Sequence, residues 1–433
     1  MQRFSRQRSN IGLRSALLTL GMSLAASAAL AEPPVYAVFE LEARCNFSGA
    51  FNLPDSAFFA NTTAQLNTTG QVAFDVEVLP TTTGQGVWFG AGGEGEIVYQ
   101  SPADTFVLSV ALNDAGRAVW DEAFSSPDGL YSYDSATETS AFVTDLPLGA
   151  TSWGSPAINT AGGIGYRAGF SGSGQAWVSY DGGSTVPIHA AEAGLVGSSP
   201  YSFLFTPSFN DQRRIAGKVR LGAAGQVGES QPDEVRSFAA DGSSTLIARD
   251  RDADAGSPYS RFDNGVAATD DGRVAFIATL TAGGRGVFLS DGTSTTTIAT
   301  EAGAEVSSIE FFAPAVNNAG LVAFRAFDEN GLRAVFVGDG QALTVVAREH
   351  DLIATDLGPA RIDQHDASPV FGGGVSINAG GAVVFAATLT PPDNNQVEWG
   401  TGMFVAQAES ALIFSDGFES GDTTAWTITV GGP

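Results

Sequence analysis

One short pattern recurs seven times along this chain and constrains its fold more than any other feature. An asparagine is followed three residues later by glycine, and then by a small-and-aromatic run, as in Asn67-Thr-Thr-Gly70-Gln-Val-Ala-Phe74. Successive copies begin 46 to 61 residues apart. The repeated positions are Asn67 and Gly70, Asn113 and Gly116, Asn159 and Gly162, Asn210, Gly272, Asn317 and Gly320, and Asn378 and Gly381. The fourth copy lacks its glycine and the fifth its asparagine, yet the spacing is that of a repeat protein.

The chemistry of this motif predicts a tight turn between two antiparallel strands. The asparagine side chain can accept a hydrogen bond from the backbone N–H two residues further on. The glycine can adopt the positive φ that closes such a turn. A proline often precedes the motif, as in Ser-Pro-Ala-Ile-Asn159, where it is tolerated at a strand start.

A second hairpin follows in each repeat and completes a four-stranded unit. In the fifth copy, apolar runs flank Asp291-Gly292, and Asp-Gly between β-rich runs is a strong hairpin signal. Units of four short strands and about 40 to 50 residues are typical of β-propeller blades, whose sheets are buried on both faces. We therefore predict an all-β, seven-bladed propeller; an open solenoid or two sandwiches are the alternatives.

The two ends of the repeat region suggest how the ring closes. The seventh copy has a third strand at 402–406 but no good fourth strand, while the strand 35–41 before the first copy is unassigned. We predict that 35–41 pairs antiparallel with 402–406, which removes exposed sheet edges. The segment 411–414 is the competing candidate for this fourth strand of the seventh unit.

The first 31 residues have the pattern of a Sec-type signal peptide. Four arginines and no acid precede an apolar run that ends in Ala29-Leu30-Ala31, a small-x-small cleavage pattern. We therefore expect export, with the mature protein secreted, periplasmic or on the cell surface. The expected organisation is a signal peptide at 1–31, the propeller at 32–410 and a tail at 411–433.

Charge, cysteine content and hydropathy limit the partners of this chain and the way it is stabilised. The chain has 47 acids against 21 bases and a net charge of −26, which disfavours nucleic acid and anionic lipid surfaces. Cys45 is the only cysteine, so no disulfide forms within the chain. No stretch after the signal peptide is apolar enough for membrane insertion.

The repeats resemble the tandem NxxGxxAF repeats of bacterial exported proteins, from about residue 37 to 408. The tail sequence Asp416-Gly-Phe-Glu-Ser-Gly-Asp-Thr-Thr-Ala-Trp426 resembles a short C-terminal element of exported proteins from some Gram-negative bacteria. The resemblance implies an exported repeat protein and no particular activity.

Few residues carry recognisable chemistry. Asp250, Asp252 and Asp254 precede Gly256 and resemble the start of a calcium loop, although its twelfth position is Arg261 instead of glutamate. The segment 179–186 resembles the Asp-box turn of sialidase-type propellers, which is a structural turn. We identify no catalytic residue, and calcium is the one cofactor that the pattern suggests.

The sequence thus favours a non-enzymatic exported propeller that binds or organises an extracellular glycan or protein through its loops. The alternative is a propeller-fold hydrolase or lyase, sialidase-like, that acts on envelope or environmental polysaccharide. Fold alone does not decide between the two.

Overall fold

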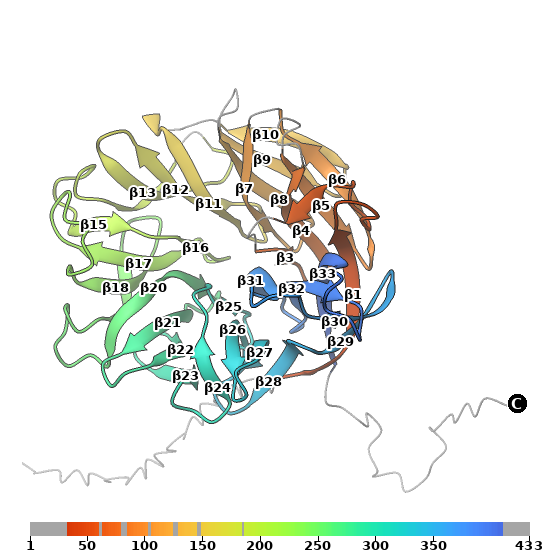
Figure 1. Cartoon of the computed structure of the whole chain (residues 1–433). Coiled ribbons are helices and arrows are strands. Elements are labelled where there is room, and N and C mark those ends of the chain that lie inside the picture. Colours follow the sequence, from red (N-terminus) through yellow and green to blue (C-terminus); the bar gives the residue numbers. More distant parts are fainter. Residues whose placement is uncertain are drawn as a thin grey trace, which may run out of the picture.

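The computed structural model describes residues 33–59, 63–78, 85–102, 105–123, 129–144, 149–183 and 186–409. Within these ranges the strands form seven antiparallel sheets arranged as a ring, with no α-helix (Figure 1). The predicted seven-bladed β-propeller is confirmed. The expected signal peptide and tail lie outside the described residues. In the described part of the chain, no helix could cross a membrane.

The first three blades follow one another along the chain. Blade 1 contains β2 (Ala57–Phe59), β3 (Gln65–Leu66), β4 (Gln71–Val78), β5 (Gln85–Ala91) and β6 (Glu94–Gln100). Blade 2 contains β7 (Phe106–Leu112), β8 (Arg117–Ala123), β9 (Gly129–Asp134) and β10 (Thr139–Thr144). Blade 3 contains β11 (Ser152–Ile158), β12 (Ile164–Phe170), β13 (Gly174–Tyr180) and β14 (Ile188–Ala191).

The next three blades repeat this order. Blade 4 contains β15 (Tyr201–Leu204), β16 (Ser208–Phe209), β17 (Ile215–Leu221), β18 (Asp233–Phe238) and β19 (Ser244–Arg249). Blade 5 contains β20 (Tyr259–Ala268), β21 (Val274–Leu280), β22 (Arg285–Ser290) and β23 (Thr295–Thr300). Blade 6 contains β24 (Val306–Ile309), β25 (Ala315–Val316), β26 (Val322–Asp328), β27 (Arg333–Gly338) and β28 (Leu343–Arg348).

Blade 7 joins the two ends of the propeller. It contains β29 (Leu352–Thr355), β30 (Gly358–Ile362), β31 (Phe371–Ile377), β32 (Val383–Thr390), β33 (Gly400–Glu409) and, from the start of the chain, β1 (Val35–Cys45). β1 pairs antiparallel with β33 from Val35 opposite Glu409 to Cys45 opposite Thr401. The predicted ring closure is therefore confirmed, and the closing strand is longer than the sequence indicated.

The closing strand is also fastened by buried side chains. Arg44 is 1% exposed and forms two 2.8 Å hydrogen bonds to the carboxylate of Asp356, in the β29–β30 hairpin. It also donates to the carbonyl of Trp399 at 2.7 Å. β1 is thus held by blade 7 beyond its strand pairing.

The core is divided into seven apolar clusters, one between each pair of neighbouring blades. The aromatic residue of the motif stacks on an aromatic residue of the third strand in several blades, as Phe74 does on Trp88 at 4.8 Å and Phe324 on Phe336 at 5.6 Å. Because the blades are buried on both faces, these strands are apolar on both sides.

Each motif forms the turn between the first two strands of its blade. In all seven copies the amide of the fourth residue donates to the carbonyl of the first, at 2.9–3.2 Å. The six glycines have φ between 76° and 92°, and Arg213 takes their place in the fourth copy with φ 56°. The asparagine oxygen accepts mainly from the N–H four residues on, as from Gln71 to Asn67, and the expected bond two residues on is added in the first two copies.

We expect Gly70→Ala to lower the free energy of unfolding by roughly 1–2 kcal/mol. A Cβ on Gly70 meets nothing within 4 Å, so the cost arises from the backbone conformation at φ 84° alone. Gly197→Ala is the matched control, because its Cβ also meets nothing and its φ is not positive. Urea denaturation measures both; equal effects of the two substitutions would contradict this account.

Candidate functional site

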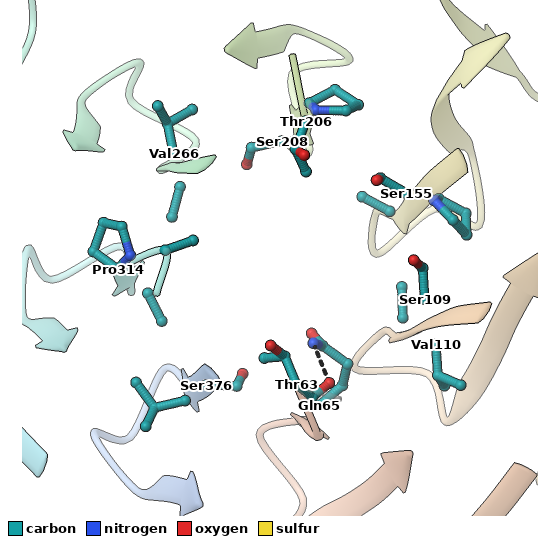
Figure 2. A pocket seen from close by; sticks show the side chains of 18 of the residues that line it. Thr63, Gln65, Ser109, Val110, Ser155, Thr206, Ser208, Val266, Pro314 and Ser376 are labelled. Atoms are coloured by element: carbon teal, nitrogen blue, oxygen red, sulfur yellow. Dashed lines mark hydrogen bonds between the residues drawn. The ribbon is translucent and has the colours of Figure 1, made fainter. Parts of the chain in front are cut away.

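The innermost strands of the seven blades enclose a channel along the axis of the ring (Figure 2). The channel has a volume of about 610 Å³. Its wall is built from corresponding segments of each blade, and hydroxyl, amide and small apolar side chains point into it. The labelled lining residues are Thr63, Gln65, Ser109, Val110, Ser155, Thr206, Ser208, Val266, Pro314 and Ser376.

Irregular backbone in the inner strands forms this wall. The ladder between β7 and β8 shifts register between Leu108 and Ala111, and β11, β20 and β31 have similar shifts. Ser109 and Ser155 lie in the shifted segments with φ of 53° and 52°. Such bulges bend a strand and redirect its side chains, which here places serines at the channel wall.

The channel wall holds very little charge. Among the described residues that line it, Asp75 is the one titratable side chain, and Asp75 is 8% exposed. The described part of the lining contains no histidine, lysine, arginine or cysteine. The wall can therefore form hydrogen bonds with a neutral polar ligand, and Asp75 is the one carboxylate among its described residues.

One mouth of the channel is framed by the motif asparagines, which join neighbouring blades. The amide nitrogen of Asn67 donates to the carbonyl of Asn113 at 3.1 Å, and that of Asn378 donates to the carbonyl of Asn67 at 2.9 Å, across the ring closure. Asn113, Asn210 and Asn317 form the same bond with the next blade. The asparagines therefore fix the turns to one another as well as shaping each turn.

Acidic side chains at this mouth also form hydrogen bonds between neighbouring blades. Asp114, Asp211 and Asp270 each accept a hydrogen bond of 2.7–2.9 Å from a backbone N–H of the preceding blade. Asn318 accepts the equivalent bond from Asp270. The acid excess of the sequence is thus partly explained by bonds between blades.

Buried cations join three consecutive pairs of blades toward the opposite mouth. Lys218 donates at 2.9 Å to the carbonyl of Phe262, in the inner strand of the next blade. Arg285 and Arg325 donate in the same way to the carbonyls of Ile309 and Gly373. Each cation pairs with a carboxylate and lies over a phenyl ring, as Lys218 does with Asp233 at 3.0 Å and Phe205 at 4.1 Å. Burial lowers the pKa of Lys218 and of Arg325.

The calcium candidates are placed in the loop between blades 4 and 5. Asp250 is 3% exposed and its carboxylate accepts hydrogen bonds from the N–H groups of Asp252, Ala253 and Asp233. Asp254 accepts from the N–H of Gly256. No group of three potential metal ligands comes together anywhere in the described ranges. Asp250 therefore acts as a turn cap in this structure, and burial raises the pKa of its carboxyl.

The Asp-box-like segment lies at the turn after β13. Asp181 accepts a hydrogen bond from the N–H of Gly183 at 3.4 Å, and Gly182 has φ 83°. The histidines are spread apart: His189 is buried and contacts Ser179 at 2.9 Å, while His365 is exposed and contacts Glu398. Neither feature lies in the channel lining.

Comparison with solved structures shows the propeller fold. An oligogalacturonate lyase in complex with manganese aligns with a TM-score of 0.51 at 9% identity, covering 88% of this chain and 100% of that one. The β-propeller domain of the Trilobed protease from Pyrococcus furiosus aligns with a TM-score of 0.51 at 11% identity, covering 82% and 96%. TolB from Acinetobacter baumannii aligns with a TM-score of 0.43 at 15% identity, and the chain spans 63% of its length.

Sequence comparison identifies the family. No curated protein matches the sequence of this chain. A family model described as a family of unknown function, DUF7453, matches residues 158–433, from the third motif copy to the C-terminus. The chain therefore belongs to the DUF7453 family of unknown function.

Proposed function

We propose that this protein is an exported, non-enzymatic binding module that holds the end of a neutral glycan in its central channel. The observation that carries the proposal is the composition of the channel wall, where hydroxyl and amide groups from several blades converge around an almost uncharged space. A volume of about 610 Å³ is that of a typical small-ligand site. Export is the expectation from the N-terminal sequence.

An exposed aromatic residue at the rim supports a sugar as the ligand. Phe311 is 82% exposed and lies two residues before Ala313, which lines the channel. The guanidinium of Arg285 lies 3.9 Å from its ring centroid and holds the ring in place. An exposed ring next to a hydroxyl-lined channel suits a ligand that has both apolar faces and hydroxyl groups.

A hydrolase or lyase is less consistent with this wall. Glycoside hydrolysis uses two carboxyl groups on either side of the scissile bond, and the described lining offers only Asp75. The lyase among the structural neighbours acts on oligogalacturonate, an anionic substrate, whereas this lining has no cation to bind a carboxylate. We therefore propose binding without turnover.

A glycan array with residues 32–433, followed by calorimetry on the best neutral ligand, tests the proposal. Ser376 lies on the channel wall, so Ser376→Trp should fill the channel and weaken binding at least about tenfold, a loss of about 1.4 kcal/mol. Thr297→Trp, on the exposed outer strand β23, is the matched control and should bind as the wild type does.

Three results would contradict the proposal. They are no binding to any neutral glycan, unchanged binding by a folded Ser376→Trp variant, and release of product from any glycan during the same incubation. Melting temperatures of both variants establish that they are folded.

A further inference from the structure

A second hollow lies away from the channel, where the motif turn of blade 3 meets blades 2 and 4. We call it the inter-blade groove; its volume is about 420 Å³. Its walls include β10, the third motif turn and the turn after β13. The side chains used in the argument below are Arg117, Phe142, Tyr180, Asp181 and Arg213.

Arg117 has unused hydrogen-bonding capacity in this groove, as comparison with its counterpart Arg214 shows. Both residues follow their motif turn directly. The side chain of Arg214 forms three hydrogen bonds, to the hydroxyl and carbonyl of Ser237 and to the hydroxyl of Thr245. Among the described residues, the side chain of Arg117 forms one, at 3.2 Å to the hydroxyl of Ser132, the counterpart of Ser237.

The sequence of blade 2 explains the difference. Ala141 pairs with Ser132 as Thr245 pairs with Ser237, so Arg117 has an alanine where Arg214 has a hydroxyl acceptor. Among the ion pairs of the described residues, Arg117 has no carboxylate partner, although the chain has 47 acids. Its guanidinium therefore faces the groove with donors available to a ligand.

Arg213 provides a second, independent observation. It occupies the motif position at which the other six copies have glycine, and its φ of 56° costs a non-glycine residue roughly 1–2 kcal/mol. Its side chain reaches the same groove and donates to Asp181 at 2.7 Å. Backbone strain that persists beside a hollow is a recognised sign of a functional position.

Two aromatic rings complete the lining. Phe142 is 41% exposed and packs edge-on against Tyr131 at 5.3 Å, which fixes its ring. Tyr180, which is half-buried, lines the groove from blade 3. Arginines that can bind an anion in a bidentate manner, together with one exposed and one half-buried aromatic ring, suit a sugar that carries a compact negative group.

We propose that the inter-blade groove is a binding site for an anionic sugar, whose carboxylate or sulfate group is held by Arg117 and Arg213. The site is separate from the central channel, whose described lining has no cation, so it extends the proposed function to a second ligand class. Asp181 keeps the Arg213 side chain oriented, and the bond from Arg213 lowers the pKa of Asp181 so that the pair stays ionised.

Calorimetry on residues 32–433 tests the proposal with four probes: a trimer of mannuronic acid, its methyl ester, a sulfated neutral trisaccharide and inorganic sulfate. We expect the free acid or the sulfated sugar to bind at least about tenfold more tightly than the methyl ester. The stronger of these two identifies carboxylate or sulfate as the natural group. Inorganic sulfate alone should bind more weakly than either sugar, because it does not contact Phe142 or Tyr180.

Variants separate the groove from general charge effects. Arg117→Gln, which can still bond to Ser132, should weaken binding at least about tenfold. Arg213→Gly should weaken it severalfold while raising the melting temperature, because it relieves the positive φ. Arg261→Gln is the control: it removes the same charge from an arginine that is 57% exposed on the propeller surface.

The proposal is overturned if the methyl ester binds as tightly as the acid and the sulfated sugar does not bind, or if folded Arg117→Gln binds like the Arg261→Gln control. Ser376→Trp should retain binding in the groove. Failure of the channel proposal and failure of the groove proposal are therefore distinguishable.

Discussion

A chain that begins at Asn46, and so lacks the closing strand β1, is expected to lose the cooperative unfolding of the whole ring. Without β1, the edge of β33 exposes its backbone donors and acceptors over nine paired positions. The apolar clusters on both sides of blade 7 also lose members, including Leu41 from one and Ala43 from the other. The contact between blades 1 and 7 would then rest on the remaining side chains of β32 and β33, such as Val384 and Met403.

Chemical labelling of Lys218 measures directly how often blade 4 opens. Lys218 is the only lysine in the chain, and it lies in blade 4, far from the closure in sequence. Lys218 is 2% exposed, so a lysine-specific reagent reaches its amine when blade 4 opens. We expect labelling of Lys218, followed by mass spectrometry, to be at least about a hundredfold faster in the shortened chain. This corresponds to a loss of about 3 kcal/mol in the opening equilibrium.

Removal of the tail from residue 411 is the matched control and should leave the labelling rate unchanged. Unchanged labelling in the chain that begins at Asn46 would contradict the closure argument, since it would mean that blade 4 is stable without the ring. Loss of cooperativity should also appear as a broadened or multistep urea transition.

The repeated turn made the propeller predictable, because one motif specifies the local backbone in every blade. The pattern also predicted the closing strand, since one strand too many at the start matched one too few at the end. Departures from the motif were harder to interpret. Gly217 stands where other copies have an aromatic residue, and the structure shows why: the ring of Trp177, from blade 3, lies within 2.5 Å of where its Cβ would be.

The candidate sites depended on contacts between blades, which a repeat pattern does not reveal. Lys218 and Arg325 both occupy the ninth position of their motif copies, whereas Arg285 lies on β22, the third strand of its blade. The role that all three share at the inner-strand carbonyls therefore emerges only in three dimensions. The alternating acids after Arg249 suggested an ion, and in the structure Asp250 accepts hydrogen bonds from the backbone amides of Asp252 and Ala253. Arg213 was the one signal of the inter-blade groove that the sequence offered. A bulky residue at a motif position that requires positive φ marks a candidate functional position from sequence alone.

The ring closure should also depend on pH, through Glu42. This residue of β1 is fully buried, and its carboxylate accepts 3.1 Å hydrogen bonds from the amides of Gly92 and Gly93, at the β5–β6 turn of blade 1. Burial raises the pKa of Glu42 to about 7, and the nearby charge of Glu40 adds to this effect, while the two amides oppose it. Glu42 thus links the closing strand of blade 7 to the first blade.

Because the pKa of Glu42 is raised from 4.5 in the unfolded chain to about 7 in the folded protein, the folded state binds more protons between these values. The contribution of Glu42 to the free energy of unfolding is therefore largest below pH 4.5 and falls as the pH rises to 7, by about 3 kcal/mol. Glu42→Gln cannot ionise and should remove this dependence, while losing about 1 kcal/mol at every pH because its amide nitrogen cannot accept the second hydrogen bond. We expect urea denaturation to show that the two proteins are nearly equal in stability at pH 5 and that the wild type is less stable by about 2 kcal/mol at pH 8, whereas Glu305→Gln, at an exposed acid, should follow the wild type throughout. A constant difference between the wild type and Glu42→Gln from pH 5 to 8 would show that Glu42 is already ionised in the folded ring, and that its two amide bonds outweigh its burial.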